Sequence, residues 1–289
     1  MNKTEQTAQY VTDKILGKLK QGVRPWSRPY NGVVMTIPKR ANGEPYSGCN
    51  MILCWLMQDD YPNPYWLTFN QIKDLGGNVK GERSPIKLIR PMTVKDKNDP
   101  DKTVPIGYVA YPVFNASQAA GLPENFQPPK QTEFSNHDER DEQVNDLISA
   151  TGAQIETKDG IPCYVPSLDK ICMPAWGDFK SSADYYGTLL HEIVHWTGHK
   201  SRLDRLEFKN KKGYAFEELV AELGSAFLMA QLGITSTVRD DHADYIGSWI
   251  QALQNDNRYI LEASKLASKA VDFVLNSAEF PQQHLVNGA

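Results

Sequence analysis

The sequence His191-Glu192-Ile193-Val194-His195 places two histidines four residues apart. On an α-helix this spacing puts both imidazoles on one face, one turn apart, where they can reach a single metal ion. The glutamate between them points toward the same open side, where a metal-bound water would lie. This pattern is typical of zinc-dependent hydrolases, although two satisfied core histidines on a buried helix would produce the same spacing.

The residues around the motif favour the first interpretation because they predict a buried helix over residues 183–197. This segment contains no proline, Ser181 or Ser182 can cap its start, and Gly198 stands where helices commonly end. Apolar side chains flank the motif on both sides, namely Leu189, Leu190, Ile193, Val194 and Trp196.

A zinc site of this type needs a third protein ligand, and the next predicted helix, residues 214–232, offers glutamates. We rank Glu218 first, Glu222 second and His199 third, because the glycine before His199 ends the helix and lets that side chain swing away. Glu222 lies one turn after Glu218 and could instead hold the free N–H of a ligating histidine. For Glu217 we expect a solvated position.

The chemistry that follows is hydrolysis of a peptide bond. Zinc lowers the pKa of a bound water toward 7, Glu192 takes the proton, and the same carboxylate passes it to the leaving amine. A donor should stabilise the oxyanion, and the candidates, each also compatible with a purely structural role, are Tyr185, Tyr186, His242 and Tyr245. Zn²⁺ is the expected cofactor, although a His/His/Glu site also accepts Mn²⁺ or Co²⁺.

Composition limits the cellular setting. The chain has 289 residues, of which 40% are apolar, enough for two domains with real cores. No apolar run approaches the length of a membrane span, and the N-terminus lacks the apolar region of a signal peptide. The cysteines, without any CxxC spacing, fit reduced thiols: Cys49, Cys54, Cys163 and Cys172. We therefore expect a cytoplasmic protein with no membrane partner.

The charge is unevenly distributed along the chain. Residues 1–128 carry a net charge of +5 and residues 129–289 a net charge of −9, although the whole chain has only −4. A basic half and an acidic half suggest different partners, while an ordinary solvated surface could also account for +5.

In the basic half, positive side chains alternate with aromatic rings, as single-stranded nucleic acid requires: cations follow phosphates and rings stack on bases. Trp26 and Tyr46 are equally compatible with the core, and for Trp55 we favour the core. We expect the basic residues to be exposed in either case. The DNA-binding candidates are Arg24, Trp26, Arg28, Lys39, Arg40, Tyr46, Lys80 and Arg83.

The pattern of elements predicts an α+β protein. A small α+β DNA-binding domain over residues 1–128 precedes a proline-rich, charged linker over 129–142 and a mainly helical domain with a short sheet over 143–289. The expected helices cover residues 4–20, 143–151, 183–197, 214–232, 240–253 and 257–275. The expected strands cover residues 86–90, 104–114, 161–165 and 170–174.

Four motifs in the first half resemble the N-terminal domain of the ArdC antirestriction family, which is shared with plasmid conjugative primases: Tyr46–Asn50, Trp66–Gln71, Gly76–Gly81 and Pro112–Gln118. Three in the second half resemble the family's zincin-type metallopeptidase domain: His191–His199, Ser201–Arg205 and Glu217–Glu222. The resemblance covers nearly the whole chain and keeps the order of both motif sets.

The resemblance implies an antirestriction protein of conjugative plasmids that binds single-stranded DNA and protects incoming DNA. It also implies a gluzincin-type site, with His191 and His195 as ligands, Glu192 as the base and a downstream glutamate, Glu218, as third ligand. A host restriction protein or another protein would be the substrate. Two alternatives stay open: a DNA-binding protein with a structural or vestigial metal site, and a plain cytosolic zinc peptidase.

Overall fold

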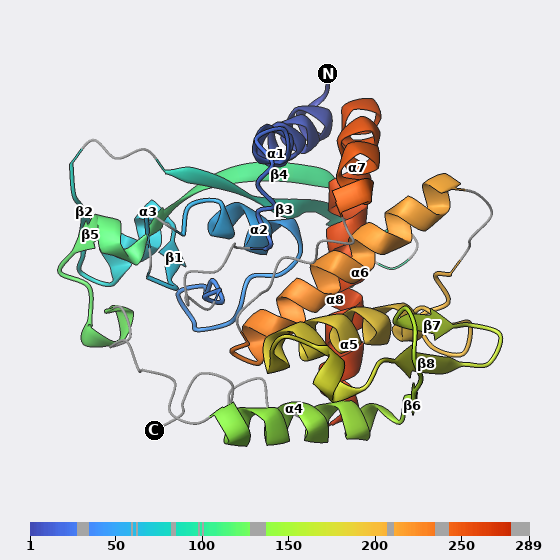
Figure 1. The fold of residues 1–289 in the computed structure, drawn as a ribbon. Coiled ribbons are helices and arrows are strands. Elements are labelled where there is room, and N and C mark those ends of the chain that lie inside the picture. The colour runs from blue at the N-terminus through green and yellow to red at the C-terminus, as the bar shows by residue number, and fades with distance from the viewer. Residues whose placement is uncertain are drawn as a thin grey trace. The chain divides into compact units, whose positions relative to one another are not determined.

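The computed structural model of the chain (Figure 1) describes residues 1–27, 35–58, 60–61, 63–81, 85–97, 99, 101–127, 137–206, 211–234 and 243–278. It forms two compact units, each assembled from separate stretches of sequence. The first unit consists of Met1–Gln21, Thr36–Gln131 and Leu253–Leu261, and the second of Gly22–Met35, Thr132–Ala252 and Glu262–Ala289. The mixture of helices and short sheets in both confirms the predicted α+β class.

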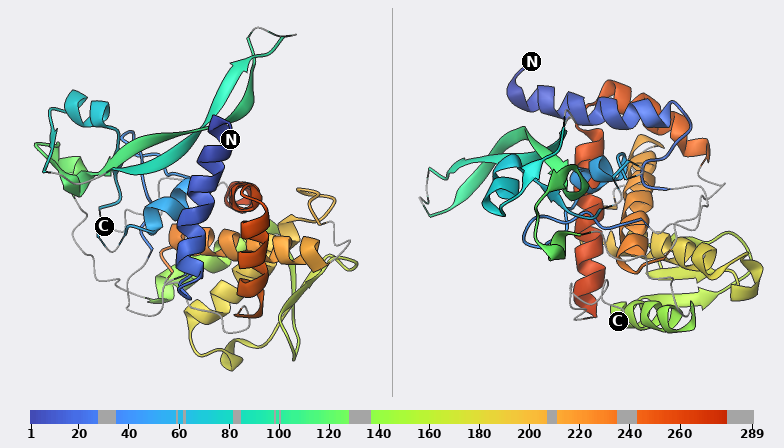
Figure 2. Two further views of the ribbon diagram at one scale, coloured as in Figure 1. Left: turned by 90° about the horizontal axis from the view of Figure 1, so that it is seen from above. Right: turned by 90° about the vertical axis from the view of Figure 1, so that its left-hand side faces the viewer.

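The first unit is built around an antiparallel sheet of order β1-β4-β3. Its strands are β1 (Trp66–Leu67), β3 (Ile86–Lys95) and β4 (Thr103–Asn115), and a two-stranded ribbon pairs β2 (Asn78–Val79) with β5 (Ala119–Ala120). The views of Figure 2 show β3 and β4 as a long hairpin. Strand β3 continues five residues beyond the predicted end at residue 90. Residues 91–95 pair with β4 but show no apolar pattern that the sequence could have revealed.

Three helices accompany this sheet: α1 (Lys3–Leu19), α2 (Cys49–Trp55) and α3 (Phe69–Asp74). Helix α1 begins at a capping box, in which the Asn2 side chain accepts the Glu5 amide and the Glu5 carboxylate accepts the Asn2 amide, both at 2.9 Å. It contacts β4 with its apolar face. Helix α3 is capped in the same way by Thr68 and Gln71.

The second unit contains α4 (His137–Thr151), the sheet strands β6 (Gln154–Thr157), β7 (Cys163–Val165) and β8 (Lys170–Met173), and α5 (Ser182–Thr197) and α6 (Lys211–Gln231). The strand order is β6-β8-β7, with β6 parallel and β7 antiparallel to β8. Helix α4 begins inside the predicted linker 129–142, whose residues 129–136 lie outside the described part of the chain.

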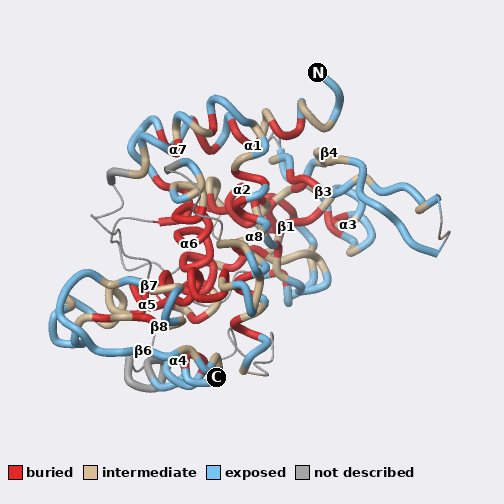
Figure 3. Tube along the Cα trace, turned by 90° about the vertical axis from the view of Figure 1, so that its right-hand side faces the viewer, coloured by how far each residue is buried: buried red, intermediate tan, exposed pale blue. Residues whose placement is uncertain are grey.

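Helices α5 and α6 pack closely and form the buried centre of the second unit (Figure 3). Gly224 of α6 makes this approach possible, because a Cβ atom at that position would lie 2.8 Å from Val194 on α5. Two further helices, α7 (Ala243–Asn255) and α8 (Tyr259–Ser277), follow the predicted ranges closely. Within the described ranges, no helix combines the length and apolar character that crossing a membrane requires.

Candidate metal centre

Helix α5 presents both motif histidines on one buried face. The Ser181 hydroxyl caps the helix by accepting the Asp184 amide at 3.1 Å, and the helix continues through Thr197 before Gly198 ends it. His191 and His195 are both buried, and their Nε2 atoms lie 3.1 Å apart. The predicted helix therefore brings the two imidazoles to one point, as their spacing requires.

Helix α6 brings Glu218 to the same point. Its two carboxylate oxygens lie 3.4 Å from His191 Nε2 and 3.5 Å from His195 Nε2. One ligand atom from each residue falls within 4.8 Å of the others, and this is the one such group of His, Cys, Asp or Glu found among the described residues. Two imidazole nitrogens and one carboxylate oxygen that converge in a buried position match the donor set of a divalent transition metal.

Glu217 fixes the orientation of His195, so our expectation of a solvated Glu217 was wrong. Glu217 is only 4% exposed, and its Oε1 lies 3.2 Å from His195 Nδ1. Arg205 donates to both oxygens of Glu217, at 3.0 to 3.2 Å, and also to the Val194 carbonyl and the Thr197 hydroxyl. A histidine whose Nδ1–H is held by a carboxylate turns the lone pair of Nε2 toward the metal position.

Glu222 lies behind the other histidine and is neutralised by a distant part of the chain. Its Oε2 is 4.0 Å from His191 Nδ1, and its Oε1 accepts a hydrogen bond from Arg24 at 3.1 Å. Arg24 is only 8% exposed, so our expectation that this residue is solvent-exposed and contacts DNA was wrong. Its guanidinium is committed to a buried ion pair within the second unit.

Removing the Arg24 side chain should therefore destabilise the protein rather than weaken an electrostatic contact with DNA. We expect Arg24→Ala to lower the free energy of unfolding by about 3–5 kcal/mol, because the Glu222 carboxylate would remain buried without its cation. Urea denaturation measures this. Lys102→Ala is the control, since Lys102 and Asp99 form an exposed ion pair worth about 0–1 kcal/mol. Equal losses in the two variants would contradict the prediction.

Glu192 is held by the sheet next to it. Its Oε2 accepts the backbone N–H of Tyr164, on strand β7, at 2.8 Å, and the side chain is 5% exposed. One oxygen of the carboxylate is thus held by an edge strand, and the charge of Glu192 acts on the nearby His195. This leaves the second oxygen available for proton transfer.

The close packing of histidines and glutamates in the cluster shifts their pKa values. Burial opposes a charge on His195, but hydrogen bonds to Glu217 and Glu218 outweigh it and raise the pKa of His195 to about 10. Burial likewise opposes ionisation of Glu218, yet the hydrogen bonds from His191 and His195 hold its pKa well below the usual range. The buried carboxylates therefore demand a positive charge at this point, which a proton or a metal ion can supply.

A tyrosine missed from the sequence belongs to this cluster. Tyr214 lies beside Glu218 and Tyr245, and burial together with the Glu218 charge raises the pKa of the Tyr214 phenol. Tyr214 lies four residues before Glu218 on α6, a spacing that could have revealed it. Tyr245 was among the predicted oxyanion donors, and its ring centre lies 6.1 Å from that of Tyr214.

The other predicted site residues of the second half lie elsewhere. Tyr185 and Tyr186 pack against Trp176, with ring centres 4.6 and 5.4 Å away, and Tyr186 donates to Asn145. His199 follows the end of α5 and pairs with Ser201 at 2.8 Å. His242 lies outside the described residues.

Two of the predicted DNA-stacking rings lie in the core. Trp26 is 0% exposed and packs edge-on against Trp249 in the second unit, at 6.2 Å between ring centres. Tyr46 is buried in the first unit, where it donates to the Trp66 carbonyl and its ring lies under Arg40. Because both rings are buried, the core interpretation applies to Trp26 and Tyr46, and neither ring is open to stack on a base.

The remaining basic candidates differ in exposure. Lys80 is exposed, Arg40 and Lys39 are half-buried, and burial lowers the pKa of Lys39. Arg28 and Arg83 lie outside the described residues. An exposed ring that we had not selected is Phe69, which is 47% exposed at the start of α3 with the Lys73 ammonium 5.4 Å from its centre.

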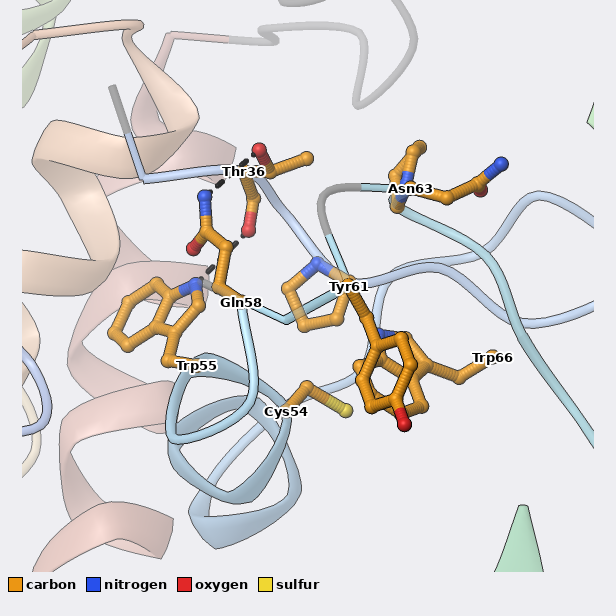
Figure 4. A pocket seen from close by; sticks show the side chains of 9 residues that line it. Thr36, Cys54, Trp55, Gln58, Tyr61, Asn63 and Trp66 are labelled. Atoms are coloured by element: carbon orange, nitrogen blue, oxygen red, sulfur yellow. Dashed lines mark hydrogen bonds between the residues drawn. The ribbon is translucent and has the colours of Figure 1, made fainter. Parts of the chain in front are cut away.

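A small hollow also lies in the first unit (Figure 4). It has a volume of about 190 Å³ including its open mouth, and Trp55, Tyr61 and Trp66 are among the residues that line it. The Gln58 side chain donates to the Thr36 hydroxyl at 3.0 Å, and the Trp55 indole donates to the Thr36 carbonyl at 2.9 Å. The Gln58 carbonyl oxygen is buried without a hydrogen-bond partner among the described residues, and none of the lining residues belongs to the metal cluster.

Comparisons with protein families divide the chain into two consecutive parts. Residues 5–145 match a model described as the N-terminal domain of anti-restriction factor ArdC. Residues 142–266 match a model described as a zincin-like metallopeptidase. The two matches confirm the resemblance noted from the sequence motifs.

Solved structures agree with the family models. The metal-free crystal structure of the antirestriction protein ArdC from plasmid R388 has a TM-score of 0.80 and 38% identity, covering 95% of this chain and 98% of that one. The Mn(II)-bound structure of the same plasmid's ArdC has a TM-score of 0.80 and 37% identity, covering 94% and 97%.

Curated relatives fall into two groups. Two proteins of Escherichia coli named DNA primase TraC are 35% and 36% identical over 92% of this chain, which spans only 19% and 26% of their lengths. An uncharacterized protein of Sinorhizobium fredii, y4eC, is 31% identical over 96% of this chain and 94% of its own length.

Proposed function

This chain belongs to the ArdC antirestriction family, and we propose from this premise that it binds single-stranded DNA and protects incoming plasmid DNA during conjugation. The first unit would bind the DNA, and the second would act as a metal-dependent peptidase in the cytoplasm. The observation that carries the peptidase proposal is the buried convergence of His191, His195 and Glu218 beside Glu192.

We propose His191, His195 and Glu218 as the metal ligands. A divalent cation bound there supplies Lewis-acid polarisation of a carbonyl and lowers the pKa of a bound water. Zinc suits this donor set, and manganese or cobalt can occupy it as well. The R388 relative whose structure is described as Mn(II)-bound supports a divalent ion of this class.

The chain's own residues would then carry out the proton transfers. Glu192 would accept a proton from the attacking water and deliver it to the leaving amine, while the Tyr164 amide keeps its other oxygen in place. Arg205 and Glu217 would hold the His195 ring. The Tyr214 hydroxyl, next to Glu218, is the best placed of the described phenols to donate to a developing oxyanion.

The sheet offers a way to hold a protein substrate. Strand β7 is an edge strand of the order β6-β8-β7, and an extended peptide can pair with such an edge through backbone hydrogen bonds. The substrate would be a host restriction protein or another protein of the recipient cell. The Tyr164 amide would belong to the same edge and so link substrate position to Glu192.

Metal uptake tests the proposed ligand set. We expect the protein stripped with a chelator to bind one Mn²⁺ or Zn²⁺ per chain, measured by calorimetry and by elemental analysis after gel filtration. Glu218→Gln should weaken this binding strongly, because it removes the anionic donor from a buried His/His/Glu set. The matched control Glu262→Gln changes an exposed glutamate and should leave uptake unchanged. Unaltered uptake by Glu218→Gln would refute the assignment.

For DNA we propose the exposed cations and ring near α3 and β2 as part of the binding surface. Helix α3 contacts β2. Phe69 and Lys73 are exposed on α3, and Lys80 is exposed directly after β2. Lys39 and Arg40 belong to the same unit and remain candidates. A ring beside ammonium groups is the combination that stacks on bases while following phosphates.

Two substitutions separate stacking from charge in this surface. We expect Phe69→Ala to weaken binding to an unstructured oligonucleotide by about 5- to 150-fold, the equivalent of 1–3 kcal/mol, with an unchanged salt slope. Lys80→Ala should lower the slope of log K against log salt by about 0.7. Fluorescence anisotropy at several salt concentrations measures both.

Phe69→Trp is the control for these variants, because it keeps a stacking ring and should retain the parent affinity. Parent-like binding by both Phe69→Ala and Lys80→Ala would place the DNA surface elsewhere.

A second candidate function is a DNA-binding antirestriction protein whose metal site is structural. The observation that favours it is the burial of Glu192. Little of its carboxylate is accessible to a substrate, and one of the two oxygens already accepts the Tyr164 amide. In this case protection would come from occlusion of the DNA, and hydrolysis would not be required.

A further inference from the structure

Two cysteines face one another across the sheet that borders the metal cluster. Strands β7 and β8 are antiparallel, and their register pairs Cys163 directly with Cys172. Directly opposed residues of an antiparallel pair project to the same face of the sheet. Cys163 is exposed and Cys172 half-buried, whereas the neighbours Ile171 and Met173 are buried on the opposite face. The two thiols therefore share the outer face, where small molecules can reach them.

The local hydrogen bonding fixes the type of this pair. The Tyr164 amide points away from β8, since it donates to Glu192, so Tyr164 and Ile171 form a non-hydrogen-bonded pair. The neighbouring positions 163 and 172 then form a hydrogen-bonded pair, for which the Cα–Cα spacing is typically about 5.5 Å. Disulfides most often join Cα atoms about 5.5–6 Å apart. The two thiols are close enough for Cys172 to raise the pKa of Cys163.

We propose that Cys163 and Cys172 form a redox-active dithiol, which closes to a cross-strand disulfide and fixes strand β7 against β8 beside Glu192. In the reaction with oxidised glutathione, each cysteine loses its hydrogen and one S–S bond forms. Glutathione disulfide takes up the two electrons and two protons and leaves as two thiols.

The position of the pair gives its oxidation a consequence at the site. Cys163 directly precedes Tyr164, whose amide holds the Glu192 carboxylate. A covalent link from β7 to the central strand β8 restricts the local opening that would release this amide. Oxidation would thus hold Glu192 and the edge strand in the arrangement described here, whether or not the site hydrolyses peptides.

The environment of the pair also sets the conditions for oxidation. Burial raises the pKa of the Cys163 thiol, and the nearby Cys172 and Glu192 raise it further. Because the thiolate is the attacking species, the reaction should be slow at neutral pH and accelerate as the pH rises.

The other two cysteines provide an internal reference. Cys49 and Cys54 are both buried in helix α2 of the first unit, and burial raises the pKa of Cys54 strongly. In the folded protein they should react far more slowly with an aqueous thiol reagent. A native titration of the reduced protein should therefore detect two thiols rapidly out of four.

The test is oxidation of the full chain with glutathione disulfide, followed by non-reducing tryptic digestion and mass spectrometry. Trypsin cleaves after Lys158, Lys170 and Lys180, so that Cys163 and Cys172 fall in separate peptides, residues 159–170 and 171–180. We expect these two peptides to be joined by a disulfide and the two rapidly reacting thiols to be lost. On a non-reducing gel the oxidised chain should run as a monomer, as the reduced chain does.

Exchange of the Tyr164 amide with deuterium should become slower after oxidation. In the matched variants Cys163→Ser and Cys172→Ser, the remaining thiol should instead carry a mixed disulfide with glutathione, and the exchange rate should stay at its reduced value. Circular dichroism checks that these variants fold, and the parent test needs neither of them. Mixed disulfides on the parent without linked peptides, or links only between chains, would overturn the proposal.

Discussion

Replacing Glu192 by glutamine will remove peptide hydrolysis while leaving metal binding intact. General acid–base groups contribute about 10²- to 10⁴-fold to rate, and we expect a loss in this range with a general peptide library as substrate. The fold should survive, because the glutamine carbonyl can still accept the Tyr164 amide that Glu192 accepts now. Product release by mass spectrometry and metal content by elemental analysis measure the two quantities on one preparation.

Glu262→Gln is the control, because it makes the same chemical change at an exposed glutamate. The same variants then separate the two proposed functions in a mating assay, which compares plasmid transfer into restricting and non-restricting recipients. Loss of protection with Glu192→Gln would support proteolysis as the mechanism, whereas full protection would support DNA occlusion. Hydrolysis at the parent rate would show that Glu192 is not the base.

Replacing His195 by alanine will reduce metal binding and thermal stability together. The substitution removes one of three converging donors and leaves Glu217 and Arg205 without the ring that they hold. At a metal concentration of 100 times the Kd, binding stabilises a folded protein by about 2.7 kcal/mol, and the variant should lose most of this gain. Calorimetric titration and melting curves with and without metal measure the effect.

His199→Ala is the matched control, because His199 lies after the end of α5 and pairs with Ser201 outside the cluster. It should keep the metal stoichiometry of the parent and its metal-dependent shift in Tm. If His195→Ala binds metal with the parent stoichiometry, the ligand assignment is wrong.

The centre of the second half could be predicted from the sequence because its information is local. The motif helix was expected over residues 183–197 and covers Ser182–Thr197, since its cap, its period and its terminal glycine all lie within it. The choice of Glu218 rested on a second helix with clear helical spacing. The structure places that side chain with His191 and His195.

The surroundings of the site could not be read in this way because their partners are far apart in sequence. Arg24 and Glu222 are 198 residues apart, so a basic and aromatic stretch was indistinguishable from a DNA-binding surface. Glu217 lies on the same helix as Glu218, directly before it. Only its contact with Arg205, which the sequence does not reveal, shows that its side chain faces inward. Strand β6, which pairs in parallel with β8, lacks the apolar alternation that would have revealed it.

The insertion of Arg24 and Trp26 into the second unit limits how genes of this kind can recombine. The family models match consecutive segments, which suggests an exchange point near residues 142–145. A crossover there would supply the metal helices with a foreign residue opposite Glu222 and a foreign side chain beside Trp249. An exchange at that point would therefore keep both contacts only between parents that share this short N-terminal anchor.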